Sequence, residues 1–228
     1  MTASALIELR GVRAFAGAAP VSLRVGRGER VALLGRNGIG KTTLLRALAG
    51  LALPADGSIV RPPTIGYMPQ DYRASLLPWL SVRDNVALPL RALALSTREH
   101  DARLDEAIAV VALPDSLLGQ TPQRLSGGEQ QLVALARSLA WQSQVVLFDE
   151  PLSALDVSTR ASLRLRLAAS LEARGLACVL VSHDLDDVLS LATRWVVLGG
   201  DEGEVVADQL VSVGRGALEA AVLGAKAA

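Results

Sequence analysis

The sequence predicts an α/β fold with a parallel-sheet core, and three observations support this prediction. Short apolar runs that suit buried strands begin at Val31, Val145 and Cys178. A glycine-rich loop or an acidic pair follows the first two runs, and segments with helical apolar spacing come after them. A helical pattern from Val82 to Ala112 interrupts this alternation. We therefore expect a parallel sheet that carries an inserted helical lobe.

The remaining strand-like runs complete this order of elements. They are Ala5 to Leu9, Val21 to Val25, Ile65 to Met68, and two runs that begin at Trp195 and Glu204. The first two are expected to form antiparallel strands near the N-terminus. The chain is thus expected to be one domain, with its core at residues 1–71 and 142–215, a helical lobe at 72–141 and a short Ala/Gly-rich tail at 216–228.

Within the expected lobe, apolar residues recur at helical spacing. Leu104, Ile108, Val111 and Ala112 share one face, and Pro114 is expected to end the helical run.

A phosphate-binding loop is indicated by the pattern G-x-x-x-x-G-K-[ST] between a strand-like run and an amphipathic helix. Its glycines let successive N–H groups point at phosphate oxygens, and the helix N-terminus adds partial positive charge. Lys41 supplies a full charge, and the Thr42 hydroxyl is expected to ligate Mg²⁺. The alternative is a glycine-rich turn before an ordinary helix. The residues expected to bind the nucleotide here are Gly35, Asn37, Gly38, Gly40, Lys41, Thr42 and Thr43.

Two acids follow the second strand-like run, Val145 to Phe148. Ligands bind at the carboxyl ends of strands in open α/β sheets, so we expect Asp149 to meet the Mg²⁺ of the neighbouring phosphate loop. Glu150 faces a different direction and is expected to orient or deprotonate the water that attacks the γ-phosphate. The alternative is that both acids cap the next helix.

The segment Leu125 to Gln131 opens a second amphipathic helix. Ser126 and Glu129 fit a capping box, which by itself explains a helix start. Gly127 and Gly128 in the first turn cost on the order of 1 kcal/mol each relative to Ala. A close approach to a ligand would explain that cost.

Composition narrows the function classes. Lys plus Arg equals Asp plus Glu, and no basic cluster stands out, so no nucleic-acid partner is expected. The single cysteine, Cys178, lies in an apolar run and is expected to be buried in a reducing compartment. The segment Met1 to Ala5 shows no secretion signal, and no apolar stretch reaches roughly 18 residues, so we expect no membrane span.

The chain resembles the nucleotide-binding subunit of an ATP-binding cassette (ABC) transporter from about Leu6 to about Asp208. Six elements in the family's order carry the resemblance: Gly35–Thr43 as Walker A, Gln70 as Q-loop, Leu125–Glu129 as signature, Val145–Glu150 as Walker B, Ser153–Asp156 as D-loop and His183 as switch histidine. It implies a RecA-like P-loop NTPase core with an N-terminal antiparallel β-region and a helical lobe. It also implies ATP and Mg²⁺ as cofactors and Mg²⁺-dependent ATP hydrolysis.

The resemblance assigns roles within one subunit. Phe15 would stack on adenine, and Gln70 would touch Mg²⁺ or the attacking water and sense the transport partner. His183 would contact the γ-phosphate and hold Glu150 and the water in register. A lone histidine after a strand is more often structural, and an aromatic in the N-terminal β-region more often belongs to the core.

Other roles would cross between subunits. Ser126, Gly127 and Gly128 would reach the γ-phosphate held by the other subunit, and Asp156 would link the two sites. The resemblance thus implies a homodimer, or a pair with a homologous ATPase subunit, that sandwiches two ATP molecules.

One position departs from the family pattern. Where the family commonly has an arginine shortly after the signature glycines, this chain has Leu132. This removes a charge and several donors from the helix. Arg137 on the same helix is a candidate for part of that polar network.

The segment Leu76 to Val86 resembles importer subunits of the nitrate, sulfonate and taurine group. Its apolar side chains, Trp79 especially, are candidates either for a groove that receives a helix of the membrane subunit or for packing within the lobe. We therefore expect a peripheral ATPase at the cytoplasmic face of the inner membrane, with permease subunits and a solute-binding receptor as partners. The alternative is a soluble ABC-type ATPase of DNA repair or translation, which would be expected to carry a long coiled coil or two cassettes.

Overall fold

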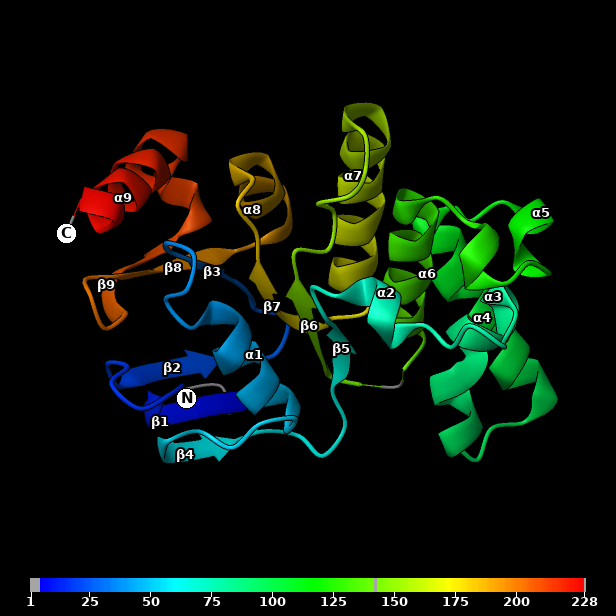
Figure 1. Ribbon diagram of the computed structural model, residues 1–228, viewed down its shortest axis with the longest axis horizontal. Coiled ribbons are helices and arrows are strands. Elements are labelled where there is room, and N and C mark those ends of the chain that lie inside the picture. Colours follow the sequence, from blue (N-terminus) through cyan, green and yellow to red (C-terminus); the bar gives the residue numbers. More distant parts are fainter. Residues whose placement is uncertain (1–4, 142, 228) are drawn as a thin grey trace.

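The computed structural model describes residues 5–141 and 143–227, and its strands form two sheets. The smaller sheet is antiparallel, with the order β2-β1-β4 (Figure 1). Its strands are β1 (Ile7–Arg13), β2 (Val21–Val25) and β4 (Asp56–Val60). The expected N-terminal antiparallel region is confirmed, although β1 begins two residues later than expected and extends to Arg13.

The larger sheet has the order β5-β6-β7-β3-β8-β9. Its strands are β3 (Arg30–Leu34), β5 (Gly66–Met68), β6 (Val145–Asp149), β7 (Ala177–Val181), β8 (Arg194–Gly199) and β9 (Glu204–Leu210). All neighbours pair in parallel except β9, which pairs antiparallel with β8. The predicted parallel core is therefore confirmed. Because parallel strands share one direction, the residues after β3, β6 and β7 meet at one edge of the sheet.

Successive residues of the central strands enter two different apolar clusters. In β6, Val145 and Leu147 face the cluster shared with the small sheet and α1 (Lys41–Ala49). Val146 and Phe148 face the cluster shared with the helices on the other side. The sheet is therefore buried on both faces, which explains why its strands read as continuous apolar runs. Cys178 in β7 is fully buried, as expected.

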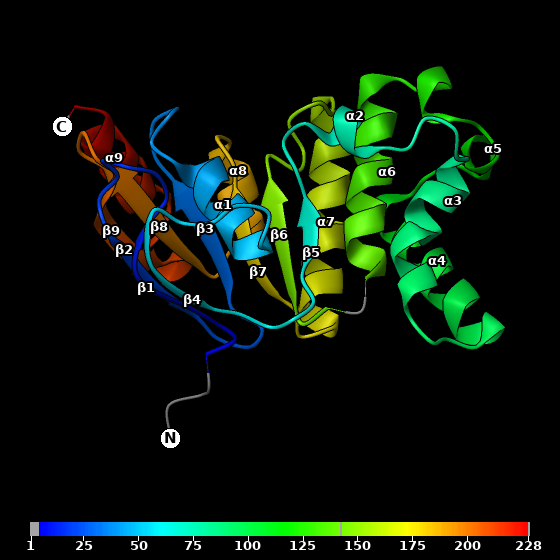
Figure 2. The same cartoon turned by 60° about the horizontal axis from the view of Figure 1, so that its bottom comes forward.

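Two of the helices that cover the second face of the sheet lie between β6 and β8 in sequence, and the helical lobe lies beyond them. They are α7 (Val157–Ala173) and α8 (Leu185–Leu191). Figure 2 shows α6 (Gly127–Ala140) beside α7, between the sheet and the other lobe helices. Those are α2 (Tyr72–Ser75), α3 (Val82–Ala87), η1 (Leu88–Ala92), α4 (Thr97–Val111), α5 (Asp115–Leu118) and η2 (Pro122–Arg124).

The helical pattern expected from Val82 to Ala112 forms more than one helix in the structure. The structure breaks it after η1, and α4 starts again at Thr97. Ser96 caps that start: its Oγ accepts from the N–H of Glu99, and its own N–H donates to Oε2 of Glu99 at 2.9 Å. Such a capping box marks a helix start within the segment.

The C-terminal segment forms more structure than the expected short tail. After β9 and a short turn (η3, Val211–Val213), α9 spans Arg215–Ala227 and buries Leu218 completely. In the described part of the chain, no helix is long and apolar enough to cross a membrane.

Candidate active site

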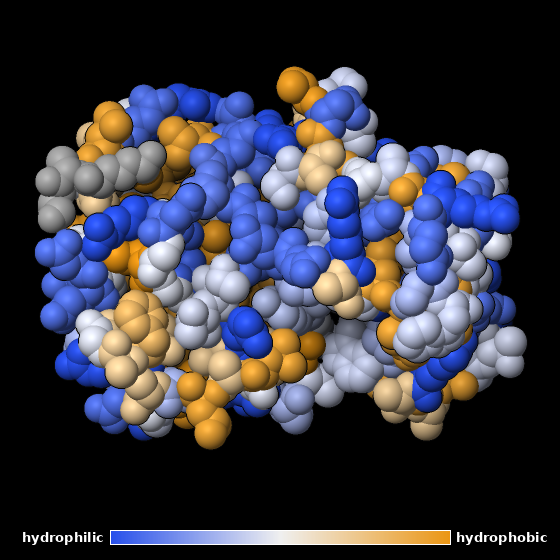
Figure 3. Space-filling view, viewed as in Figure 1, coloured by the Kyte–Doolittle hydropathy of each residue, from blue (hydrophilic) through white to orange (hydrophobic). Residues whose placement is uncertain are grey.

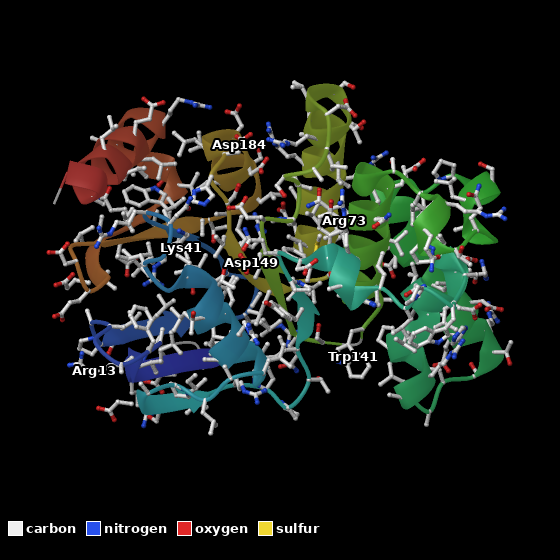
Figure 4. The ribbon with its side chains drawn as sticks, viewed as in Figure 1. Arg13, Lys41, Arg73, Trp141, Asp149 and Asp184 are labelled. Carbon is white, nitrogen blue, oxygen red and sulfur yellow. The ribbon has the colours of Figure 1, made fainter. Side chains whose placement is uncertain are left out.

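A cavity of about 630 Å³ opens at the carboxyl ends of the parallel strands. It brings together residues that the sequence singled out from five separate segments. Its lining is Phe15, Asn37, Gly38, Gly40, Lys41, Thr42, Thr43, Gln70, Asp149, Glu150, Val181 and His183. Figure 4 shows Lys41 and Asp149 close together at the centre of the molecule.

The loop between β3 and α1 adopts conformations that need glycine. Gly35 has φ 144°, and a Cβ there would lie 2.5 Å from the carbonyl oxygen of Leu198. Gly40 has φ 105°, and a Cβ there would lie 3.0 Å from the ring of Phe15. The loop therefore packs closely at its base, and its backbone turns before α1 begins.

Lys41 is nearly buried at the start of α1. Its ammonium group donates to the carbonyl oxygens of Gly35 at 2.7 Å and Arg36 at 2.9 Å. Burial lowers the pKa of Lys41, whereas the carboxyl groups of Glu150 and Asp149 raise it. The loop thus holds a cation inside the cavity, where an anionic ligand would meet it.

Asp149 ends β6 with both carboxylate oxygens buried and without a hydrogen-bond partner among the described residues. Burial raises the pKa of Asp149, and nearby Thr42 and Lys41 act in the opposite direction. Buried unpaired carboxylate oxygens beside a hydroxyl suit a hard cation such as Mg²⁺. The residues present therefore fit a magnesium ion that is shared with a phosphate ligand.

Glu150 follows Asp149 with a left-handed backbone, at φ 56°. Its N–H donates to the carbonyl oxygen of Val181 at 3.0 Å, so the chain turns sharply where the strand ends. The side chain is 11% exposed and lines the cavity. Burial raises the pKa of Glu150 to about 7, against a hydrogen bond from the backbone of His183 that lowers it. A carboxyl group with this pKa is matched to proton transfer near neutral pH.

His183 lies after β7, with its side chain half exposed. Its Nε2 lies 3.3 Å from Oε1 of Glu150, so the two predicted residues meet. The preceding residue anchors this loop, because Oγ of Ser182 donates to buried Asp187 at 3.1 Å.

The other group of predicted residues lies outside the cavity. Of the described residues, those lining the cavity do not include Ser126, Gly127, Gly128 or Asp156. Ser126 caps α6 in a complete capping box with Glu129. The cavity at the strand ends and the capped start of α6 are therefore two separate places in the described part of the chain.

Comparison with known proteins identifies the family of this chain. A family model described as "ABC transporter" matches residues 18–153. The chain belongs to the ABC transporter family.

Individual relatives agree with this assignment. The taurine import ATP-binding protein of Sinorhizobium fredii is 40% identical over 194 residues, which cover 82% of this chain and 72% of the relative. The spermidine/putrescine import ATP-binding protein of Methylococcus capsulatus is 40% identical over 211 residues, which cover 87% of this chain and 54% of the relative. A dimeric post-hydrolysis structure of the cassette MJ0796 with ADP and Pi matches with a TM-score of 0.80 and 28% identity, over 90% of this chain and 98% of that one. The protein is thus an ABC-type ATPase, and the expected fold is confirmed.

Arg73 is a neighbour of the ABC signature that sequence reasoning missed. A Cβ on Gly127 would lie 2.5 Å from Nη2 of Arg73, and a Cβ on Gly128 would lie 3.3 Å from the side chain of Leu155. The ends of two flexible side chains of the same chain therefore lie close to these glycines. Arg73 projects from α2 on the lobe side of the molecule (Figure 4). It follows Gln70 closely in sequence, which is the one signal that could have singled it out.

Arg137 does not take the place of the arginine that the family commonly has at the position of Leu132. Its guanidinium donates to the carbonyl oxygen of Ser75 at 2.6 Å and to its hydroxyl at 2.7 Å, so it ties the far part of α6 to α2. Leu132 itself is buried in the apolar cluster of the lobe together with Tyr72. An apolar contact thus takes the place of a polar network at this position.

Asp156 is the N-cap of α7. Its carboxylate accepts from the backbone N–H groups of Ser158 and Thr159 at 3.0 Å each. Hydrogen bonds from Ser158 and Thr159 hold the pKa of Asp156 well below its usual range. The D-loop therefore ends in a fixed, charged cap.

Arg160, also missed from the sequence, joins the D-loop to the loop that carries His183. It donates to Asp184 Oδ2 at 2.8 Å and to the carbonyl oxygens of Ser153 at 3.2 Å and Leu155 at 3.4 Å. No sequence pattern marks an arginine in the first turn of a helix as a bridge between two loops.

Proposed function

We propose that this protein is the ATPase subunit of an ABC importer for a small anionic or organic solute, and that it works as a head-to-tail dimer. The observation that carries the proposal is the separation of the phosphate cavity from the signature at Ser126–Gly128. Within one chain the signature has no nucleotide to contact, whereas a second copy placed head to tail would bring one to it. The dimeric structures of the MJ0796 cassette support this arrangement.

ATP is proposed to bind in the cavity with its phosphates along the loop before α1. The N–H groups of this loop and the ammonium group of Lys41 would hold the phosphates, in place of the two carbonyl contacts that Lys41 makes. Adenine would stack on Phe15, whose ring lies beside Gly40 at the cavity and is 40% exposed. The proposed phosphate ligands are Gly35, Asn37, Gly38, Gly40, Lys41, Thr42 and Thr43.

Thr42, Asp149 and Gln70 are proposed to hold Mg²⁺ with the nucleotide. When bound, the ion would neutralise charge on the β- and γ-phosphates. The unpaired carboxylate oxygens of Asp149 support this role.

Glu150 is proposed to accept the proton of the attacking water, and His183 to hold Glu150 and the γ-phosphate in register. Their 3.3 Å contact and the raised pKa of Glu150 support these roles. Gln70 would help to place the water. In the partner copy, Ser126, Gly127 and Gly128 would close over the γ-phosphate, and Asp156 would connect the two sites.

A permease helix is the proposed occupant of a second groove, of about 350 Å³, between the core and the helical lobe. Its lining includes Leu51, Tyr67, Leu88 and Trp141. Leu51 in this lining is 60% exposed, and Figure 3 shows apolar atoms gathered at the lower edge of one face of the molecule. Trp79 is 73% exposed and, among the described residues, is not part of this lining. Docking here would hold the ATPase at the cytoplasmic face of the inner membrane.

The taurine relative and the resemblance of Leu76–Val86 support nitrate, sulfonate or taurine as the class of solute. A solute-binding receptor would complete such a system. Proteins that co-purify with the subunit from membranes would test this: a permease with a receptor supports the proposal, and a ribosome or DNA complex contradicts it.

The dimer is tested with Glu150→Gln, which is expected to bind ATP without turnover. With Mg²⁺ and ATP this variant should elute as a dimer in size-exclusion chromatography, and with Mg²⁺ and ADP as a monomer. A monomer under both conditions, or a crystal in which one chain alone encloses the nucleotide, would refute the proposal.

A further inference from the structure

Gln131 is a fully buried polar residue in the second turn of α6, and its side chain contacts the turn that follows β6. Its Nε2 donates to the carbonyl oxygen of Glu150 at 3.0 Å and to Oγ of Ser153 at 3.2 Å. Its Oε1 accepts from the N–H of Ala154 at 2.9 Å. One amide therefore uses both of its donor hydrogens and its acceptor on the turn that follows β6.

The residue at the centre of these contacts has an unfavourable backbone. Glu150 is in the left-handed region, which is sterically unfavourable for a residue with a side chain. Its N–H donates to Val181, and its carbonyl oxygen accepts from Gln131, from the hydroxyl of Ser153 at 3.1 Å and from the N–H of Ser153 at 3.4 Å. Both ends of this residue are thus fixed by hydrogen bonds, which is how a structure maintains a strained conformation.

This backbone determines where the carboxyl group lies. With its φ positive, Glu150 turns away from the strand, and its side chain lines the cavity and meets Nε2 of His183. Without the hydrogen bonds to its carbonyl oxygen, the residue would be free to relax to negative φ and carry the carboxyl group out of place.

We infer that Gln131 is a positioning residue for Glu150, and that it ties the catalytic carboxyl group to the helix that begins with the signature. The inference rests on the proposed function, because it acts through Glu150. Gln131 would directly connect the start of α6, which is proposed to contact the nucleotide of the partner subunit, with Glu150, which is proposed to act on the nucleotide of its own chain. This role also explains the residue type, since only a side-chain amide of this length offers two donors and one acceptor here.

Two substitutions separate the hydrogen bonds from the packing. Gln131→Met keeps the length of the side chain and removes all three bonds, whereas Gln131→Glu keeps the acceptor for Ala154 and loses both donors. Both are expected to lower kcat by on the order of 10²-fold while the KM for Mg²⁺-ATP changes less than about threefold, because misplacing a catalytic group affects chemistry more than binding. Ser153→Ala, at an exposed position, removes one partner and should lower kcat less.

A double-mutant cycle shows whether the effect passes through Glu150. In the Glu150→Gln background, single-turnover hydrolysis should be slowed less than about threefold by Gln131→Met, since the group that it positions is already gone. The matched control is Asn85→Leu, which removes another fully buried amide of the lobe, one bonded to Leu77, Leu80 and Ser81 instead of the core. The kcat of Asn85→Leu should stay within about threefold of that of the parent, provided that thermal melting shows Asn85→Leu and Gln131→Met to be folded.

The outcomes are distinct. If Glu150→Gln is slow but Gln131→Met and Ser153→Ala turn over like the parent, the inference about Gln131 fails and the proposed function stands. Equal loss from Gln131→Met in both backgrounds also overturns the inference. If Glu150→Gln turns over like the parent, the assignment of the base fails and the inference fails with it. Should Gln131→Met not fold, Ser153→Ala in the same cycle decides the question.

Discussion

Nε2 of His183 lies 3.3 Å from Oε1 of Glu150, and this contact joins the ends of two neighbouring parallel strands. Burial is the main reason that the pKa of Glu150 rises to about 7. The carboxyl group thus changes its charge near neutral pH while it is in contact with the imidazole. Two expectations about Glu150 follow, one for stability and one for turnover.

The stability of the nucleotide-free protein should depend on the charge of Glu150. A carboxyl group whose folded-state pKa is raised favours folding while it is protonated, so its contribution is complete below the unfolded pKa and is lost as pH rises through about 7. The side chain of Glu150→Gln is uncharged at both pH values. From pH 5 to pH 8, the free energy of unfolding of this variant should therefore rise relative to that of the parent by about 1 to 3 kcal/mol. Urea unfolding at both pH values, without nucleotide or metal, measures this. An equal difference at the two pH values would contradict it.

The same substitution should nearly abolish hydrolysis. Glu150→Gln is expected to lower turnover by on the order of 10² to 10⁴ because an amide cannot accept the proton of the attacking water. ATP binding, followed with a fluorescent analogue, should stay within a few-fold of the parent. Turnover close to that of the parent would remove Glu150 as the base.

Gly35→Ala should disrupt the phosphate loop. The added Cβ would meet the carbonyl oxygen of Leu198 at 2.5 Å, in a backbone region that side chains avoid. We expect a loss of at least about 1 to 2 kcal/mol in the free energy of unfolding, together with a loss of ATP binding. Gly26→Ala is the matched control, because its Cβ would come no closer than 3.7 Å to Glu29. If urea melts show equal stability for both variants, the argument from this contact is wrong.

Gly127→Ala separates contacts within the chain from contacts between chains. Arg73, whose flexible side chain is the nearest neighbour, is able to move aside, and Ala is the better helix former by about 1 kcal/mol. The monomer should therefore be within about 1 kcal/mol of the parent in stability. In the Glu150→Gln background, the ATP-dependent dimer should weaken at least about tenfold if the partner's phosphate approaches this backbone. Sedimentation analysis checks this, and an unchanged dimer would show that Gly127 serves only its own chain.

The sequence was sufficient for the parallel core and for the cavity. Each motif follows an apolar run, and parallel strands bring their carboxyl ends to one edge whatever the length of chain between them. The pattern thus predicts that Lys41 and Glu150 meet, the family resemblance adds His183, and the structure places all three in one cavity.

Other features were missed because they depend on contacts between distant segments. Strand β4 is mostly exposed and lacks an apolar alternation, and Gly57 within it has φ 88° and would place a Cβ 2.5 Å from the carbonyl oxygen of Gly11. The bridge of Arg160 and the buried amide of Gln131 each join segments that no local pattern relates.

The position of Cys178 has a practical consequence for experiments on this ATPase. It is the chain's one thiol, it is fully buried in β7, and burial raises its pKa far above the usual range. Maleimide reagents should therefore leave the native protein unmodified, because the thiolate that they need is neither accessible nor formed. A cysteine introduced at exposed Leu53 would then carry a single fluorophore, with no need to remove the natural one. Labelled at that position, the subunit could report by energy transfer when a membrane protein approaches.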